Sequence, residues 1–258
     1  MDNLNLQKTV FITGATSGIG EQTAIEFAKH GDKVIITGRR RERLEILKAK
    51  IQEDFKGEVL AIHMDVRNYN EVKDVISKLP EDFKVIDILI NNAGLALGFV
   101  PFQEGLVEDW DIMIDTNFKG LLYVTSCIVP IMIEAGKGHI INIGSIAGRE
   151  VLPNGNVYCA TKHAVDGFTK GLRHDLIKYG IKVTQVAPGA TETEFSIVRF
   201  KGDKERADNV YKGFKPLIAE DIANIIYYIS TLPPHVNIAD ILILPTSQSG
   251  IQNFHRVI

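Results

Sequence analysis

The chain alternates short, β-branched apolar runs with longer segments of helical pattern, and this alternation limits its possible folds more than any other feature. Seven apolar runs begin near residues 9, 33, 59, 86, 139, 182 and 240. Each is apolar almost throughout, which is typical of parallel strands covered on both faces. Segments long enough for crossover helices lie between them, at 20–30, 42–54, 107–135 and 157–179. We predict an α/β fold in one Rossmann domain, residues 1–258, with a doubly wound seven-stranded parallel sheet and helices on both faces.

The composition narrows the classes of function. The formal net charge of −3 gives no basic field that would favour nucleic acid or an anionic membrane surface. Two cysteines and the absence of an H-E-x-x-H pattern argue against a disulfide framework or a metal site. No apolar run reaches the ~18–20 residues of a membrane span, and the N-terminus has no secretory signal pattern. We expect a cytoplasmic protein with a small-molecule partner.

A glycine-rich turn follows the first predicted strand directly. It reads T-G-A-T-S-G-I-G, residues 13–20, and opens the first predicted helix. Glycines in such a turn let backbone N–H groups approach a pyrophosphate, and the helix N-terminus favours its negative charge. A tight strand-to-helix turn without a ligand is the alternative, although the position after the first strand disfavours it. The residues expected at the cofactor here are Gly14, Thr16, Ser17, Gly18, Ile19 and Gly20.

The second predicted strand ends in T-G-R-R-R, residues 37–41. An acidic residue at this place would bind the ribose 2′-hydroxyl of NAD, but Gly38 and Arg39 stand there instead. A guanidinium suits a 2′-phosphate because it offers paired donors. The pattern favours NADP, with Arg39 and Arg40 as its phosphate ligands, while the other arginines cap or solubilise the next helix.

Two further loops follow predicted strands and are expected at the same edge of the sheet. Asp65 and Val66 come after the third strand, and the aspartate could accept a hydrogen bond from the adenine amine. The sequence N-N-A-G follows the fourth strand, where small residues let the backbone pass close beneath a flat ligand. Its cofactor candidates are Asn92, Ala93 and Gly94.

Ser145, Tyr158 and Lys162 form a second group of candidates. Tyr158 and Lys162 are four residues apart in a predicted helix and therefore share one face. A lysine ammonium and a cationic nicotinamide would both favour phenolate over phenol, so Lys162 is expected to lower the pKa of Tyr158. The tyrosine could then act as general base in oxidation and acid in reduction, while Ser145 orients the substrate oxygen.

The motifs T-G-A-T-S-G-I-G, N-N-A-G, Ser145…Tyr158-x-x-x-Lys162 and P-G at 188–189 resemble the short-chain dehydrogenase/reductase family over essentially the whole chain. The resemblance implies that Asn117 completes an Asn–Ser–Tyr–Lys tetrad and holds a water on the lysine. It also implies nicotinamide contacts from the P-G-x-x-x-T segment. These contacts would come from Pro188, Gly189 and Thr193. One departure is Ser17, where NADP-dependent members often carry a basic residue, so the NADP prediction depends on the arginines.

A narrower resemblance concerns substrate. N-N-A-G-L-A-L-G and T-E-F-S-I-V-R-F-K-G-D are similar to NADP-dependent serine 3-dehydrogenases, or 3-hydroxy acid dehydrogenases. The resemblance implies oxidation of serine, allo-threonine, 3-hydroxyisobutyrate or 3-hydroxypropionate, with malonic semialdehyde as a reverse substrate. Such acids need a cation for the carboxylate. Arg199, in the predicted substrate loop of about 191–216, is the first candidate and Arg149 the second; a surface arginine paired with a nearby glutamate is an equal alternative for Arg199.

Two other functions remain possible from the sequence. A reductase of larger carbonyls, such as 3-oxoacyl thioesters or steroids, would have a wide apolar substrate loop, whereas this loop is charged and aromatic. A non-catalytic NADP-binding sensor would have a broken tetrad, but all four residues are present. The apolar segments 107–135 and 157–179 suggest helices that pair between subunits, and the family implies a homotetramer or dimer. We expect the tail, residues 246–258, to pack on a neighbouring subunit, although a frayed end would have similar composition.

Overall fold

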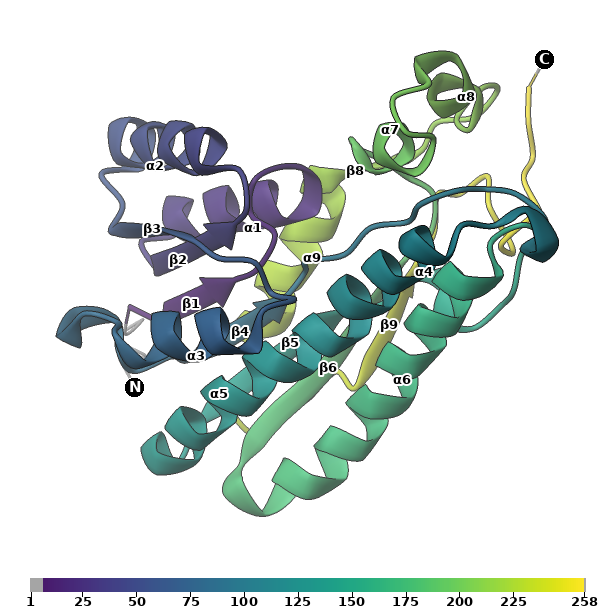
Figure 1. Cartoon of the computed structure of the whole chain (residues 1–258). Helices are drawn as coiled ribbons and strands as arrows, with labels where there is room; N and C mark the ends of the chain where they lie inside the picture. The colour runs from purple at the N-terminus through teal and green to yellow at the C-terminus, as the bar shows by residue number, and fades with distance from the viewer. Residues whose placement is uncertain (1–6, 258) are drawn as a thin grey trace.

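A computed structural model describes residues 7–257, so both ends of the predicted domain, residues 1–6 and 258, lie outside the described part of the chain. Seven parallel strands form one sheet in the order β3-β2-β1-β4-β5-β6-β9 (Figure 1). Their bounds are β1 Thr9–Ile12, β2 Lys33–Gly38, β3 Val59–His63, β4 Ile88–Asn91, β5 Gly138–Ile143, β6 Ile181–Pro188 and β9 Asp240–Ile243. The predicted seven-stranded parallel sheet is confirmed.

Helices cover both faces of the sheet, as predicted. One layer consists of α1 (Gly18–Lys29), α2 (Arg41–Phe55) and α9 (Ala219–Thr231). The opposite layer consists of α3 (Tyr69–Ser77), α4 (Val107–Ile114), α5 (Gly120–Ala135) and α6 (Asn156–Leu176). Figure 1 shows α5 and α6 running side by side across the second face.

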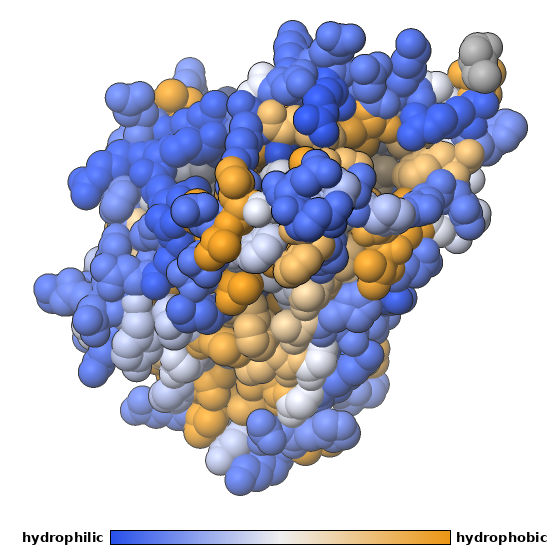
Figure 2. Space-filling model, turned by 45° about the vertical axis from the view of Figure 1, so that its right-hand side comes forward, coloured by the Kyte–Doolittle hydropathy of each residue, from blue (hydrophilic) through white to orange (hydrophobic). Residues whose placement is uncertain are grey.

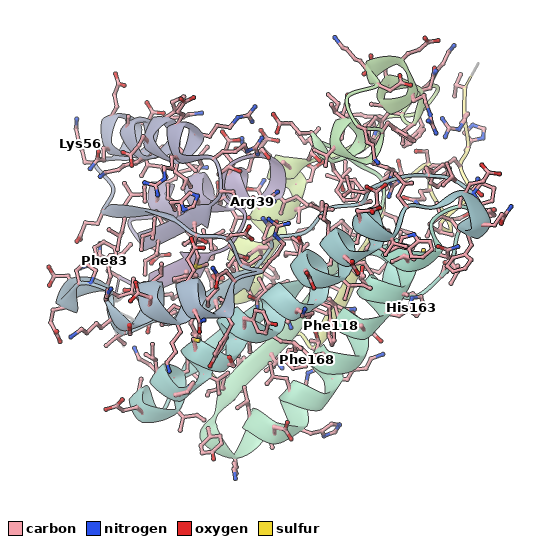
Figure 3. All side chains as sticks on the ribbon, viewed as in Figure 1. Arg39, Lys56, Phe83, Phe118, His163 and Phe168 are labelled. Carbon is pink, nitrogen blue, oxygen red and sulfur yellow. The ribbon has the colours of Figure 1, made fainter. Side chains whose placement is uncertain are left out.

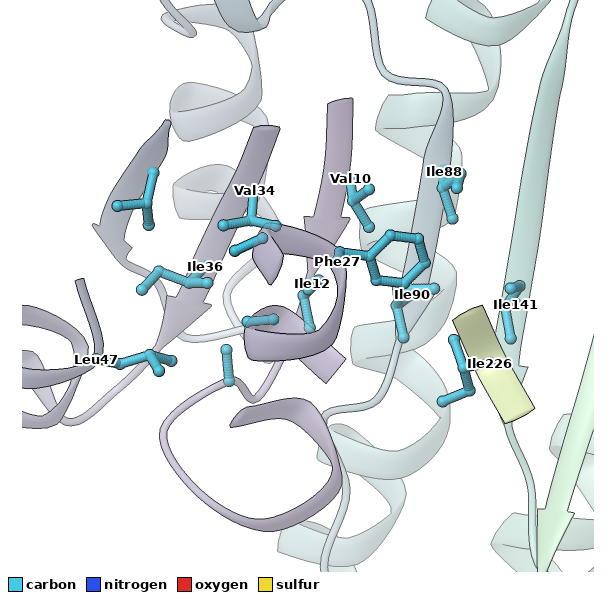
Figure 4. Packing of buried hydrophobic residues seen from close by; sticks show 14 of the residues in the cluster. Val10, Ile12, Phe27, Val34, Ile36, Leu47, Ile88, Ile90, Ile141 and Ile226 are labelled. Carbon is cyan, nitrogen blue, oxygen red and sulfur yellow. The ribbon is translucent and has the colours of Figure 1, made fainter. Parts of the chain in front are cut away.

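Each face of the sheet has its own hydrophobic core. Successive strand residues point to opposite faces, and β1 is buried on both. Val10 and Ile12 pack in the core that contains Phe27 of α1 (Figure 4). Phe11, between them, packs in the other core with Val124 of α5. This double burial explains why the predicted strands are apolar throughout rather than alternating.

The helix predicted at 107–135 is divided by a π-helical turn, Asp115–Lys119, which lies between α4 and α5. Such turns frequently mark functional sites, and this one contains Asn117. By length and composition alone, Val107–Ala135 could cross a bilayer. In the fold, the segment packs against the sheet, where Val124 and Ile128 are fully buried.

The predicted substrate loop, 191–216, contains more structure than its sequence indicates. β7 (Thr191–Glu192) pairs in parallel with β8 (Leu217–Ile218), and α7 (Phe195–Arg199) and α8 (Lys204–Asn209) lie between them. The sequence does not predict β7, because a two-residue strand is too short to give a readable period. Both short helices stand apart from the two helix layers in Figure 1.

The C-terminal tail folds back onto the substrate loop of its own chain. The backbone N–H of Val257 donates to the carbonyl of Gly213 at 2.7 Å, and the guanidinium of Arg256 donates to the carbonyl of Val210 at 3.1 Å. These contacts lie within one chain, and packing of the tail on a neighbouring subunit stays a prediction. The arginine also lies over the ring of Phe214, 4.9 Å from its centroid, which gives the tail a partner within the chain.

The strand order reverses between β1 and β4. Successive strands extend from β1 through β2 to β3 on one side, and from β4 through β5 to β6 on the other. In open parallel sheets, ligands bind in the crevice outside the carboxyl ends of the strands at such a point. The turns after β1, β2, β3, β4, β5 and β6 carry most of the predicted site residues, so the topology brings them to this edge.

Candidate active site

The glycine turn after β1 is fixed by close backbone packing. Gly14 has a φ of +66°, and a Cβ there would lie 2.8 Å from the Cα of Ala93. Gly18 also has a positive φ, +58°, and Thr193 packs against it. Residues with side chains are strained in this conformation. Glycine is therefore required at both places, and the turn presents bare backbone to the cavity beside it.

Asn92 holds this turn from the neighbouring loop. Its Nδ2 donates to the carbonyl oxygens of Thr13 and Gly14, at 2.9 and 3.1 Å. The hydroxyl of Thr13 in turn accepts from the backbone N–H groups of Asn92 and Ala93, both at 3.0 Å. A Cβ on Gly20 would lie 2.4 Å from the same amide nitrogen. Asn92 and Gly20 thus shape the turn.

The two predicted phosphate ligands have different surroundings. Arg39 is exposed at the cavity rim (Figure 3), and its guanidinium makes no hydrogen bond or ion pair within residues 7–257. Arg40 is already engaged, because it donates to the hydroxyls of Thr16, at 2.8 and 3.0 Å, and Ser17, at 2.7 Å. It also donates to Glu194 at 2.9 Å. Arg39 is therefore the guanidinium with donors to offer a phosphate.

Asp65 lines the cavity after β3 but its carboxylate is tied to Arg67. The guanidinium donates to both carboxylate oxygens, at 3.0 and 2.6 Å. Burial raises the pKa of Asp65, but the hydrogen bonds and charge of Arg67 and the charge of Arg39 outweigh it, so the pKa lies below its ordinary value. Asp65 is thus an ionised acceptor at the edge where the resemblance expects adenine, and Val66 lies beside it in the cavity wall.

Lys162 is buried beneath the carboxyl end of β5. Its Nζ donates to the carbonyl of Ile143 at 2.8 Å, and burial lowers its pKa from 10.5 to about 8. The 3₁₀ turn Ile146–Gly148 packs tightly on α6 beside it, since a Cβ on Gly148 would lie 2.7 Å from the lysine carbonyl. This contact fixes the distance between Ser145, which begins the turn, and the lysine-bearing helix.

Tyr158 lies one helical turn before Lys162 on α6 and is buried against α7. Burial raises the pKa of its phenol above the ordinary value, and the positive charge of Arg199 and a hydrogen bond from Ser145 oppose this rise only in part. The lysine is not among the groups that shift it. The pKa of Tyr158 thus lies above its ordinary value, and the lowering predicted from Lys162 is not observed.

Asn117 reaches the site from the π-helical turn. Its Oδ1 accepts from the backbone N–H of Leu95 and its Nδ2 donates to the Leu95 carbonyl, both at 2.8 Å. The same Nδ2 donates to the hydroxyl of Thr161 on α6 at 3.0 Å. A Cβ on Gly94 would lie 3.3 Å from Asn117 Oδ1 and 3.5 Å from the lysine amine. The asparagine therefore joins the N-N-A-G loop to the helix that carries Tyr158.

The two arginines predicted for a substrate carboxylate lie in different places. Arg199, at the end of α7, points its guanidinium carbon toward the ring of Tyr158, 5.4 Å from the centroid. The same carbon lies 4.9 Å from the ring of Phe195, so the cation is held between aromatic faces. Arg149 instead forms an ion pair with Asp240 on β9 and lies outside the cavity wall. Its charge is neutralised there, which argues against a substrate role.

These residues surround one cavity of about 610 Å³. Most of the predicted site residues lie in its wall: Gly14, Thr16, Ser17, Gly18, Ile19, Arg39, Arg40, Asp65, Val66, Asn92, Ala93, Gly94, Ser145, Tyr158, Lys162, Pro188, Gly189, Thr193 and Arg199. Gly20, Asn117 and Arg149 are outside it. Bare backbone at the glycine turn, the available guanidinium of Arg39 and the buried lysine together fit a phosphorylated dinucleotide at this edge.

Sequence reasoning missed several residues of the wall, above all those contributed by the tail. Phe254 and Arg256 line the cavity, and so does Tyr211, whose hydroxyl hydrogen-bonds to Ser196 at 2.7 Å. Nothing in the local sequence pattern of the tail indicates that it returns to the substrate loop. The alternation of aromatic and cationic residues in both segments is the one signal that could have paired them.

A protein-family comparison matches residues 8–204 to the short chain dehydrogenase model, and the chain belongs to this family. It is 48% identical to the NADP-dependent 3-hydroxy acid dehydrogenase of Salmonella typhi, over 93% of this chain and 96% of that protein. It is 45% identical to the serine 3-dehydrogenase of Agrobacterium fabrum, over 93% and 95%.

Solved structures agree with these relatives. The closed form of serine dehydrogenase complexed with NADP⁺ matches with a TM-score of 0.90 and 45% identity, over 96% of this chain and all of that one. Serine dehydrogenase from Escherichia coli matches with a TM-score of 0.80 and 42% identity, over 93% and 99%. The expected family and fold are confirmed, and the protein is a short-chain dehydrogenase.

Proposed function

We propose that the protein transfers hydride reversibly between NADP and the 3-hydroxyl of a small 3-hydroxy acid. The substrate class comprises serine, allo-threonine, 3-hydroxyisobutyrate and 3-hydroxypropionate, the last being the reduced form of malonic semialdehyde. The observation that carries the proposal is the position of Arg199, which places a cation 5.4 Å from the centroid of the Tyr158 ring in the same cavity. The names of the relatives support the same substrate class.

Tyr158 is the proposed acid–base. In oxidation its phenolate takes the proton of the 3-hydroxyl, and in reduction its phenol returns it. Arg199 and Ser145 both favour the phenolate against the effect of burial. Ser145 also orients the reacting oxygen, and its own hydroxyl oxygen is fixed by accepting from the backbone N–H of Ala147 at 3.0 Å. When bound, the nicotinamide supplies the hydride acceptor for oxidation and the donor for reduction.

Lys162 and Asn117 are proposed to complete the proton path and the cofactor site. The lysine amine would bind the nicotinamide ribose, and its pKa of about 8 lets it exchange protons near neutral pH. Asn117 fixes the loop at Leu95 that packs above it. Pro188, Gly189 and Thr193 would lie against the nicotinamide, since all three line the cavity after β6.

NADP rather than NAD is the proposed cofactor, and Arg39 is its first 2′-phosphate ligand. Glycine is needed at position 38, since a Cβ there would lie 2.6 Å from a methyl carbon of Thr16. A guanidinium with free donors can form paired hydrogen bonds to a phosphate. Arg40 would contribute charge, while most of its donors hold the glycine turn.

Arg199 is proposed to bind the substrate carboxylate. A bidentate pair would fix the acid while carbon 3 faces the nicotinamide. With serine, the product is a 3-oxo acid that readily loses its carboxylate.

The decisive experiment compares NADPH oxidation by malonic semialdehyde with oxidation by a 3-oxoacyl thioester. Faster turnover of the semialdehyde supports the proposal. Preference for the thioester would favour the alternative of a larger-carbonyl reductase, and no turnover of either, with NADPH bound, would favour a sensor. Product analysis with racemic 3-hydroxyisobutyrate would then define the stereochemical preference.

We also propose a cytoplasmic homo-oligomer, a tetramer or a dimer. Apolar side chains gather on the surface over α4, α5 and α6 (Figure 2), and Ile114 is exposed there. Phe168 is half-buried and packs edge-on against Phe118 between α5 and α6 (Figure 3). An apolar face of this kind suits helix pairing between subunits. Sedimentation equilibrium measures the assembly directly.

A further inference from the structure

One carboxylate bridges two parts of the molecule that are distant in sequence. Glu194 Oε2 lies 2.9 Å from Arg40 Nη1, and Glu194 Oε1 lies 2.5 Å from Arg43 Nη1. Arg40 precedes α2 and Arg43 lies in its first turn, whereas Glu194 directly precedes α7. The bridge therefore connects the helix after β2 with the helix that carries Arg199, at the rim of the cofactor cavity.

The bridge extends to the glycine turn through Arg40. The remaining donors of this guanidinium hold the hydroxyls of Thr16 and Ser17. An isolated exposed ion pair contributes little, but a network with several charge-assisted bonds from one guanidinium is the exception. Two arginines flank the carboxylate of Glu194, and their hydrogen bonds and charges lower its pKa against the effect of partial burial. The glutamate is thus ionised and paired at neutral pH.

The two ends of α7 depend on different contacts. Beyond its C-terminal end, the carbonyl of Arg199 accepts from the backbone N–H of Gly98 at 3.1 Å, and Lys201 pairs with Asp109 at 2.8 Å. The N-terminal end has the bridge of Glu194 and the packing of the preceding Thr193 on the glycine turn. Loss of the bridge would therefore leave the N-terminal end of α7 with only the packing of Thr193, while the contacts at its C-terminal end remain.

We infer that Glu194 is a positioning residue for the reaction: its bridge to Arg40 and Arg43 holds α7 across the cofactor cavity, slows cofactor release and sets Arg199 over Tyr158. The inference deepens the proposed function and rests on it for the role of Arg199. Glu194 lies in the cavity wall near the glycine turn and acts through the helix that follows it. In this way the bridge links the hold on the cofactor at the glycine turn to the position of Arg199 at the substrate.

Arg43 provides the sharpest test because it is absent from the cavity wall and pairs with Glu194 alone among the described residues. We would make Glu194→Gln, Arg43→Met and the double variant, with Glu192→Gln as the control. Glu192 is exposed two residues away and forms no ion pair within residues 7–257. Release of NADPH is followed by its fluorescence after displacement with excess NADP⁺, and KM for 3-hydroxyisobutyrate is measured separately.

Each single variant is expected to accelerate NADPH release and raise KM by roughly three- to tenfold, with a smaller change in kcat. The double variant should not exceed Glu194→Gln, because both substitutions break one bridge. High salt should bring the wild type toward the variants, since screening weakens the bridge. Glu192→Gln should behave as wild type.

The inference would be overturned if Arg43→Met released NADPH at the wild-type rate and kept the wild-type KM. Additive effects in the double variant would also overturn it. Melting temperatures of all four variants identify a folding defect, which would lower active-site content without changing the release rate of the bound fraction. The rate of NADPH release is measured without a hydroxy acid. It therefore still tests the role of Glu194 if the proposed substrate class is wrong.

Discussion

The two ends of the cavity are built in different ways. At the phosphate end, glycines and short loops meet through backbone contacts, as where Gly14 approaches the Cα of Ala93. At the substrate end, side chains from α7 and the tail meet through ion pairs and cation–π contacts, as where Arg199 lies between Phe195 and Tyr158. Backbone contacts tolerate almost no substitution, whereas side-chain contacts can be exchanged. The first end thus suits a constant cofactor and the second a selectable substrate.

The largest loss of activity is expected at Tyr158, where the two ends of the cavity meet. Tyr158→Phe removes the only proposed proton acceptor, so kcat should fall by roughly 10³-fold or more. Burial of the ring is retained, and NADPH affinity should stay within about twofold of wild type. Steady-state kinetics and NADPH fluorescence titration measure the two quantities. Tyr179→Phe, beyond the far end of α6, is the matched control; substantial turnover by Tyr158→Phe would remove the proposed mechanism.

The second prediction tests the substrate end alone. Arg199→Met keeps an unbranched side chain between the aromatic rings but removes the charge, so kcat/KM for a 3-hydroxy acid should fall by roughly 30- to 100-fold. A neutral alcohol of similar size should lose much less, and NADPH affinity should hardly change. Arg206→Met, which removes a cation stacked on Phe200, provides the comparison. Equal losses for the acid and the alcohol would contradict carboxylate binding.

The third prediction tests the phosphate end alone. Gly14→Ala introduces both an unfavourable backbone conformation and a contact of 2.8 Å with Ala93. The dissociation constant of NADPH should rise by roughly tenfold or more, and Tm should fall by several degrees. Gly31→Ala is the control, since Gly31 also has a positive φ, +85°, but nothing lies within 4 Å of a Cβ there. Equal NADPH affinities in the two variants would show that the close approach is unimportant.

The same contrast explains what the sequence could and could not predict. The sheet, the glycine turn and the Ser145–Tyr158–Lys162 spacing are local patterns, because strand periods and helix spacing follow from neighbouring residues. The bridge of Glu194 joins segments more than 150 residues apart in sequence. Likewise, the return of Arg256 to the loop at Val210 depends on tertiary packing. Arg149 looked suitable because it closely follows Ser145, but β9 offers it Asp240 as a partner.

The fourth prediction tests whether Arg39, and not the neighbouring Arg41, binds the 2′-phosphate. Arg39→Met should raise the dissociation constant of NADPH by roughly tenfold while leaving that of NADH unchanged, because only the former carries the 2′-phosphate. Arg41→Met, one helical position inside α2, should change neither. Fluorescence titration with both cofactors gives the ratio of their dissociation constants. A parallel loss for NADH would instead assign Arg39 to general packing of the adenosine.

The last and smallest effect is an effect on stability, and it is expected from the buried amine of Lys162. Its pKa of about 8 lies below the ordinary 10.5, because burial disfavours the charged form. Between these values the unfolded chain binds more protons than the folded one, so this group makes wild type more stable as pH rises from about 8 to 10.5. Lys162→Met has no amine and therefore lacks this increase in stability with pH. The Tm of wild type relative to the variant should therefore rise by a few degrees across that range, whereas parallel Tm–pH curves would mean that the amine is as hydrated in the fold as in the unfolded chain.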